Sequence, residues 1–244
     1  RRDGVRTVTV TTDRAGAWRR GLPAGVGAGP GLRAELSTLD EEGHRFYSVD
    51  LLARLTAYLG TERVLVEGRP LARARLGLEP AGGGAPLAGA ADGLDSEGLL
   101  EARLSGAAAR IKAGQALQLN LDPLDGGAAR QARMTVADLT LALDTAGSLV
   151  TGKIPPPAGF QDRLVTLRLS PRSGAAPRDF TALADDQGAF RFNSANPGFL
   201  AGPGLPLGQV GLVELIHTGA DGHRTVLAAV PRIAVFMPRL SRGQ

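Results

Sequence analysis

The chain has 244 residues, which is enough for two or three ordinary domains with apolar cores of their own. Hydrophobic residues make up 43% and charged residues 21% of the sequence, so the composition excludes a disordered chain. There are no cysteines, which excludes disulfides, thiol chemistry and cysteine-based zinc sites, and no segment approaches the roughly 18 apolar residues that a membrane helix needs.

The start of the chain, residues 1–60, predicts short strands around turns. Residues 5–12 are rich in Val and Thr and predict a strand, and residues 32–37 predict another that returns through 44–49 after an acidic turn. Residues 50–59 fit two patterns. Their repeat partners favour extended structure, whereas four leucines on one helical face favour a short amphipathic helix: Leu51, Leu52, Leu55 and Leu59. Because the chain opens at Arg1 without Met, we expect it to be processed or trimmed upstream.

The rest of the chain predicts many short strands separated by clusters of Gly, Pro and Asp. Alternating apolar residues, as in Leu117, Leu119 and Leu121, indicate strands with one buried face. Close and regular spacing of such strands is typical of an all-β sandwich or barrel. The strands are expected at 63–67, 72–79, 99–105, 115–121, 132–143, 149–152, 164–170, 189–193, 209–217 and 224–236.

Parts of one layout recur along the chain, which predicts tandem copies of a single unit. The matching segments are 65–68 with 149–152, 76–80 with 167–171, and 114–115 with 208–209, at spacings of 84, 91 and 94 positions. The start of the chain matches only the second half of this unit, through 35–36 with 214–215 and 43–45 with 222–224.

We therefore predict a partial unit at 1–60 and two complete units at 61–147 and 148–244. The junctions between them are short and not rich in Ser, which favours stacked modules and a rod over beads on a flexible string. A sandwich that lacks its first strands exposes an unpaired edge. We expect the missing strands to come from further upstream or from another chain by strand addition, and residues 5–12 are equally suited to being donated to a neighbour.

The stretch from Leu149 to Phe192 resembles the carboxypeptidase-regulatory-like and related Ig-like β-sandwich modules. The resemblance rests on Leu149-Val150-Thr151-Gly152-Lys153, on Leu164-Val165-Thr166-Leu167, and on the turn and aromatic return strand from Asp185 to Phe192. It implies tandem Ig-like antiparallel β-sandwich domains, the first one incomplete. It also implies a structural or carbohydrate-proximal accessory role in secreted proteins, with no catalytic residues to carry over.

The three histidines are the scarcest candidates for chemistry. His44 and His223 both follow a turn glycine at matching places in the repeat, which favours a structural role. His217 and His223 flank a Gly-rich turn that contains Asp221, so a two-histidine metal site is an alternative. Three convergent ligands are not established by the spacing, and a solvated hairpin is the favoured interpretation.

Two loops carry clustered acids that could hold Ca²⁺, although the full spacing of an EF-type loop is absent. One loop holds Asp92, Asp95 and Glu97, and the other holds Asp122 and Asp125. The Asp-x-x-Gly turns need no ligand, because Asp hydrogen-bonds to its own turn and Gly supplies the positive φ. We predict no catalytic, cofactor-binding or metal-binding residues and no cofactor.

Basic residues and aromatic residues leave a binding role open. The formal net charge is +4, with 26 arginines and two lysines among the 28 basic residues, interspersed with acids. That distribution favours solvated strand faces over an anion-binding surface. The aromatic residues of the first unit suit a core better than a recognition surface: Trp18, Phe46, Tyr47 and Tyr58.

The leading hypothesis is a non-enzymatic structural subunit of an extracellular or surface assembly, such as a filament, stalk or sheath. Its expected partners are protein subunits of the same assembly, through strand exchange at the incomplete first unit. One alternative is an adhesin-like module that binds a glycan or another anion, and a second is a phage or injection-machine structural protein. No nucleic-acid partner and no membrane span are expected.

Overall fold

The computed structural model describes residues 30, 32–39, 45–106, 108–122, 129–198 and 203–232. These residues form β-strands and two short 3₁₀ turns, so the all-β prediction is confirmed. The strand predicted at 5–12 lies outside the described residues.

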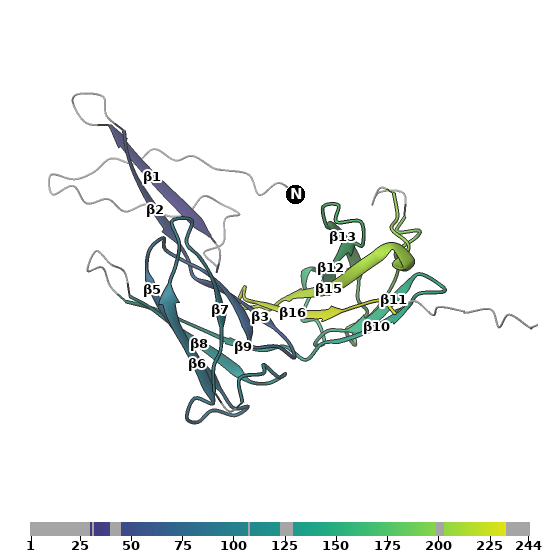
Figure 1. The fold of residues 1–244 in the computed structure, drawn as a ribbon, viewed down its shortest axis with the longest axis horizontal. Helices are drawn as coiled ribbons and strands as arrows, with labels where there is room; N and C mark the ends of the chain where they lie inside the picture. Colours follow the sequence, from purple (N-terminus) through teal and green to yellow (C-terminus); the bar gives the residue numbers. More distant parts are fainter. Residues whose placement is uncertain are drawn as a thin grey trace, which may run out of the picture.

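Seven strands build the first of two β-sandwiches (Figure 1). One sheet has the order β3-β4-β7 and the other the order β6-β5-β8-β9, with all neighbours antiparallel. The strands are β3 (Arg54–Tyr58), β4 (Arg63–Glu67), β5 (Arg73–Glu79), β6 (Ala88–Gly93), β7 (Leu99–Arg103), β8 (Ala116–Asp122) and β9 (Arg130–Thr135).

Seven further strands build the second sandwich. One sheet has the order β10-β11-β14 and the other contains β13-β12-β15-β16, again antiparallel throughout. The strands are β10 (Thr140–Asp144), β11 (Leu149–Lys153), β12 (Leu164–Pro171), β13 (Arg178–Leu183), β14 (Ala189–Asn193), β15 (Val210–Thr218) and β16 (Arg224–Ala229). The 3₁₀ turns are η1 (Gln161–Arg163) and η3 (Leu207–Gln209).

The two sandwiches have the same strand order. In each, the first, second and fifth strands form one sheet, and the fourth, third, sixth and seventh strands form the other. The segments that match in sequence at spacings of 84, 91 and 94 positions fall on equivalent strands, β4 with β11, β5 with β12, and the approach to β8 with that to β15. The sequence repeat is therefore a repeat of topology.

Each sandwich has its own apolar core, built by the alternation visible in the sequence. The first core runs in sequence from Leu55 to Val136, and the second from Leu139 to Leu215. Leu117, Leu119 and Leu121 on β8 all point into the first core and are at most 2% exposed. The unit boundaries predicted near residues 60 and 147 stay predictions.

One sheet continues from the first sandwich into the second. Strand β16 pairs in parallel with β3, although these are the last strand of the second sandwich and the first strand of the first. This pairing creates a seven-stranded sheet of order β13-β12-β15-β16-β3-β4-β7, which crosses the junction seen in Figure 1. The remaining strands β1 (Arg33–Leu39) and β2 (Arg45–Leu51) form a two-stranded sheet of their own.

Several sequence-based expectations differ from the structure. The helical alternative for residues 50–59 is wrong, since β3 occupies 54–58 as the repeat comparison favoured. The single strand expected at 132–143 is two strands, because Val136 enters the first core and Leu139 the second, and the chain changes sandwich between them. Strands β6 and β13 were not predicted, and β16 ends at Ala229 rather than at 236.

Candidate functional site

The junction between the sandwiches is the part of the structure where residues distant in sequence converge. Its backbone pairing is short, with Arg224, Thr225 and Val226 opposite Thr56, Ala57 and Tyr58. Beyond this register the Leu59 N–H donates to the Val226 carbonyl at 2.9 Å. A parallel pairing this short is marginal without support from side chains.

His223 supplies one such side-chain support. Its Nδ1 accepts a hydrogen bond from the backbone N–H of Leu55 at 3.2 Å, and the residue is only 5% exposed. A ring nitrogen that accepts a hydrogen bond carries no proton, so the imidazole is neutral with its proton on Nε2. The Asp221 carboxylate holds the turn by accepting from the His223 N–H at 3.0 Å. The His223 side chain thus makes a structural hydrogen bond across the junction, and the structural role favoured by the sequence stays a prediction.

Two further contacts tie the units together. The Ala137 N–H, on the connection between the sandwiches, donates to Thr225 Oγ1 at 3.0 Å, and Thr225 is 2% exposed. The half-buried side chain of Leu59 packs against both apolar cores. The two sandwiches therefore share apolar surface as well as backbone hydrogen bonds.

Charged side chains flank this junction on the seven-stranded sheet. Arg54 on β3 forms a two-pronged ion pair with Glu67 on β4, and both side chains are about one-fifth exposed. Burial lowers the pKa of the neighbouring Arg224, and the positive charge of Arg54 lowers it further, while Glu67 opposes both effects. Glu67 therefore offsets the repulsion between two arginines, and its pairing with Arg54 is bidentate, which is the stronger geometry.

The structure does not bring His217 and His223 together across their hairpin. His217 lies opposite Thr225 in the β15–β16 register, whereas His223 is directed to Leu55 on β3. Burial lowers the pKa of His217, with Asp162 and Asp221 acting in the opposite direction. Within the described ranges, no group of three or more His, Asp and Glu side chains could hold a metal ion. His44 lies outside those ranges.

The Asp-x-x-Gly turns before β7 and β14 have the same geometry in both sandwiches. Asp95 Oδ1 accepts from the N–H groups of residues 97 and 99 at 2.9 and 2.8 Å, and Asp185 Oδ1 accepts from those of residues 187 and 189 at 2.9 Å each. Gly98 and Gly188 follow with φ of +79° and +80°. The acids are engaged by their own turns, as the sequence predicts, and Glu97 contributes its N–H to this network.

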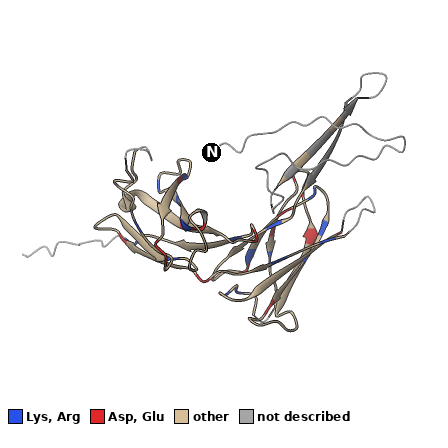
Figure 2. Cartoon of the chain, turned by 180° about the vertical axis from the view of Figure 1, so that it is seen from behind, with Lys and Arg blue, Asp and Glu red and all other residues tan. Residues whose placement is uncertain are grey.

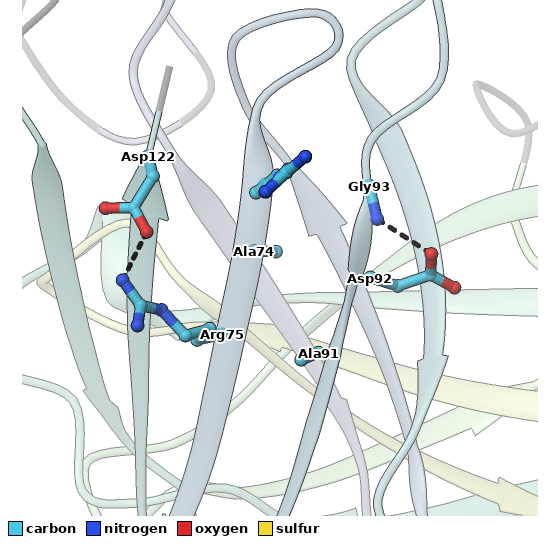
Figure 3. A pocket seen from close by; sticks show the side chains of 7 residues that line it. Ala74, Arg75, Ala91, Asp92, Gly93 and Asp122 are labelled. Atoms are coloured by element: carbon cyan, nitrogen blue, oxygen red, sulfur yellow. Dashed lines mark hydrogen bonds and ion pairs between the residues drawn. The ribbon is translucent and has the colours of Figure 1, made fainter. Parts of the chain in front are cut away.

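A shallow cavity of about 490 Å³ lies over β5, β6 and β8 (Figure 3). Small residues on β5 and β6 leave room between Arg73, Arg75, Asp92 and Asp122. Arg75 is ion-paired with Asp122, and the Asp92 carboxylate accepts from the Gly93 N–H at 2.8 Å. Two arginines and two aspartates give the cavity balanced charge, so it does not by itself select an anion. Asp125 lies outside the described residues, and the glycan or anionic partner stays a prediction.

Tyr58 is the one aromatic candidate whose side chain the structure describes. It is half-buried at the end of β3, and the Arg63 guanidinium lies 4.3 Å from its ring centroid. Burial raises the pKa of Tyr58, and the nearby Arg63 charge lowers it. The Tyr58 ring and the Arg63 guanidinium therefore stack on each other on the face of the sheet, which differs from an open recognition pocket. Trp18 and the side chains of Phe46 and Tyr47 lie outside the described part.

Basic and acidic residues occur along both sandwiches (Figure 2). Several arginines are paired with acids on the neighbouring strand, as in Arg168 with Asp179 and Arg63 with Glu101. This agrees with the interspersed charge pattern of the sequence. The part of the chain that the structure describes contains no helix long and apolar enough to cross a membrane.

The sequence placed a junction between units near Leu59, but it did not mark Arg54, Leu55 and Glu67 as residues that join the two sandwiches. No local pattern identifies a strand that pairs with a partner from the far end of the fold, because periodicity reports burial but not the identity of the neighbour. The one sequence pattern that included His223 was the recurrence of Gly-His-Arg at 43–45 and 222–224, and this pattern indicated a turn.

No family model matches the chain, and no curated protein matches it. Among solved structures, the chain is similar to one described as "tetra-tandem repeat in extending region of large adhesion protein", with 15% sequence identity and a TM-score of 0.28. The similarity covers 91% of this chain and 62% of that one, so the chain spans less than two thirds of the length of the structure it matches.

Proposed function

We propose that this protein is a non-enzymatic structural spacer, with two Ig-like sandwiches held in fixed orientation within an extracellular or surface assembly. The observation that carries the proposal is the seven-stranded sheet that continues through the junction. Domains on a flexible string move relative to one another and need no hydrogen bonds between them. A spacer that holds its two ends at a fixed distance needs contacts that restrict this motion.

The Ig-like assignment is part of this proposal. Each sandwich has seven antiparallel strands, with the first, second and fifth in one sheet and the fourth, third, sixth and seventh in the other. Ig-like sandwiches of the constant type likewise place the first, second and fifth strands in one sheet and the third, sixth and seventh in the other, but their fourth strand joins the first sheet, whereas here it joins the second. Many cell-surface domains share this sandwich architecture.

The titratable groups of the described residues support a structural role. The acids with the clearest contacts hold turns or pair with arginines, as Asp95, Asp185 and Glu67 do. His223 is buried and joins two strands. Groups used in this way are held by the fold and are not presented to a substrate.

A distance measurement between the units tests the fixed orientation. The chain has no native cysteine, so spin labels can be placed on Ser96→Cys in the first sandwich and Gln187→Cys in the second, both exposed turn positions. At pH 7.5 we expect a narrow distance distribution from pulsed electron spin resonance, as narrow as that of a control pair inside the second sandwich, Ser173→Cys with Gln187→Cys. A distribution much broader than the control would contradict the proposal.

Self-assembly is the second part of the proposal. Strands β1 and β2 pair only with each other among the described strands, and the predicted strand at 5–12 is the candidate for exchange between chains. We expect light scattering to show larger species as the concentration of the full chain rises, and removal of residues 1–12 to prevent this. A monodisperse monomer at all concentrations would contradict assembly by strand exchange while leaving the spacer unaffected.

A further inference from the structure

A single buried histidine lies at the seam of the seven-stranded sheet. Strands β16 and β3 are paired only through Arg224, Thr225 and Val226, and the bond from the Leu55 N–H to His223 Nδ1 lies directly beside the pair Arg224–Thr56. The backbone part of the junction is therefore short, and one side-chain acceptor adjoins its end. Any change at that acceptor acts on the pairing itself.

Protonation would reverse the role of this acceptor. In the neutral ring Nδ1 offers a lone pair to the Leu55 N–H, whereas in the imidazolium both ring nitrogens are donors. The proton on Nδ1 would then point at the proton of Leu55, 3.2 Å away between the heavy atoms. The ring would also carry a positive charge at a position that is only 5% exposed.

The charged groups around His223 do not cancel this penalty. Burial is the largest influence and lowers the pKa of His223, Asp221 on the same turn raises it, and Arg54 on β3 lowers it. Asp221 already accepts a hydrogen bond from the His223 backbone N–H. On the β3 side, the group that faces the ring is the positive charge of Arg54.

We propose that His223 is a pH-sensitive latch, which holds β16 on β3 when the imidazole is neutral and releases the junction when it is protonated, with both sandwiches remaining folded. The latch goes beyond the proposed spacer role, because it makes the spacer rigid at neutral pH and hinged in mild acid. Each sandwich has its own apolar cluster, so each is expected to stay folded when the junction opens.

The sign of the pH dependence follows from the closed state. The closed junction lowers the pKa of His223 below its ordinary value near 6.5, so the stabilisation is fully present above about pH 6.5. It is lost as the pH falls toward the lower pKa of the closed form, and the ratio of closed to open junctions drops by up to about tenfold for each unit of pH in that window.

The test uses the same spin-label pair, Ser96→Cys with Gln187→Cys, at pH 7.5 and pH 5.0. We expect the distribution between the units to broaden at pH 5.0 and to narrow again when the pH is restored. The pair inside the second sandwich should stay narrow at both pH values. A distribution that is narrow at both pH values overturns the latch alone, and one that is already broad at pH 7.5 overturns the rigid spacer and the latch with it.

Substitutions assign the effect to one ring. In His223→Asn the amide oxygen occupies the place of Nδ1 and does not titrate, so the junction should stay closed at pH 5.0; His223→Gln serves as a second acceptor variant. His217→Asn is the matched control, because His217 is half-buried on the same hairpin but lies opposite Thr225 within the second sandwich. It should broaden at pH 5.0 as the unsubstituted chain does. A pH response that survives in His223→Asn or disappears in His217→Asn overturns the assignment.

Discussion

Replacing Gly188 with Ala should lower the free energy of unfolding of the second sandwich by about 3 kcal/mol or more. Gly188 has φ +80°, where an alanine is strained, and a Cβ there would overlap the carbonyl oxygen of Ile154. That carbonyl cannot move freely, because the neighbouring Ile154 N–H donates to the Gly188 carbonyl at 3.0 Å. The measurement is urea denaturation followed by circular dichroism.

A matched control separates the strain of φ from the overlap. Gly174 has φ +77°, and a Cβ there would meet nothing within 4 Å. Gly174→Ala should therefore cost only about 1 kcal/mol, the penalty of the backbone conformation alone. In the first sandwich Gly98→Ala and Gly82→Ala form the equivalent pair, since a Cβ at Gly98 would overlap the Gly68 carbonyl and one at Gly82 is unobstructed. Equal losses for both members of a pair would contradict the overlap.

The same turns show what the sequence reveals well. An Asp followed three residues later by a Gly encodes its own geometry, because the carboxylate accepts from the turn and the glycine supplies the positive φ. These requirements are local, so Asp95 and Asp185 were placed correctly as turn residues. The alternation of leucines on β8 and β12 is local in the same sense, and it predicted buried faces correctly.

Strand β6 lacks that alternation and was missed for a physical reason. Strand β6 reads Ala-Gly-Ala-Ala-Asp-Gly and is held at the sheet edge by backbone pairing with β5, so its side chains carry little information. The division of residues 132–143 into β9 and β10 depends on which core receives Val136 and which receives Leu139. Both residues look alike in sequence, and only the packing of whole sandwiches distinguishes them.

The junction was beyond sequence reasoning for the same reason. The pairing of β16 with β3 joins strands that lie far apart in the chain, and its members are ordinary strand residues. The sequence predicted stacked modules whose short connections limit the bending between units. What it missed is that the last strand of one unit extends a sheet of the other, which gives His223 a role that a turn histidine would not have.

Replacing Leu59 with Asp should uncouple the two sandwiches. Leu59 packs against both apolar cores, and its N–H donates to the Val226 carbonyl across the junction. A carboxylate at this half-buried position loses the apolar contacts of the leucine and must be desolvated, which we expect to lower the free energy of unfolding by about 3 kcal/mol. The backbone bond is retained, so the loss reports the shared apolar contact.

The readout that distinguishes coupling from simple destabilisation is the number of thermal transitions. The unsubstituted chain should unfold its two sandwiches in one calorimetric transition, because contacts across the junction stabilise each unit only while the other is folded. Leu59→Asp should split this into two transitions, whereas Leu59→Met, which conserves volume, should keep one transition and cost less than about 1.5 kcal/mol. A single transition in Leu59→Asp would mean that the sheet alone couples the sandwiches, and that the apolar contact of Leu59 with both cores contributes little to their cooperation.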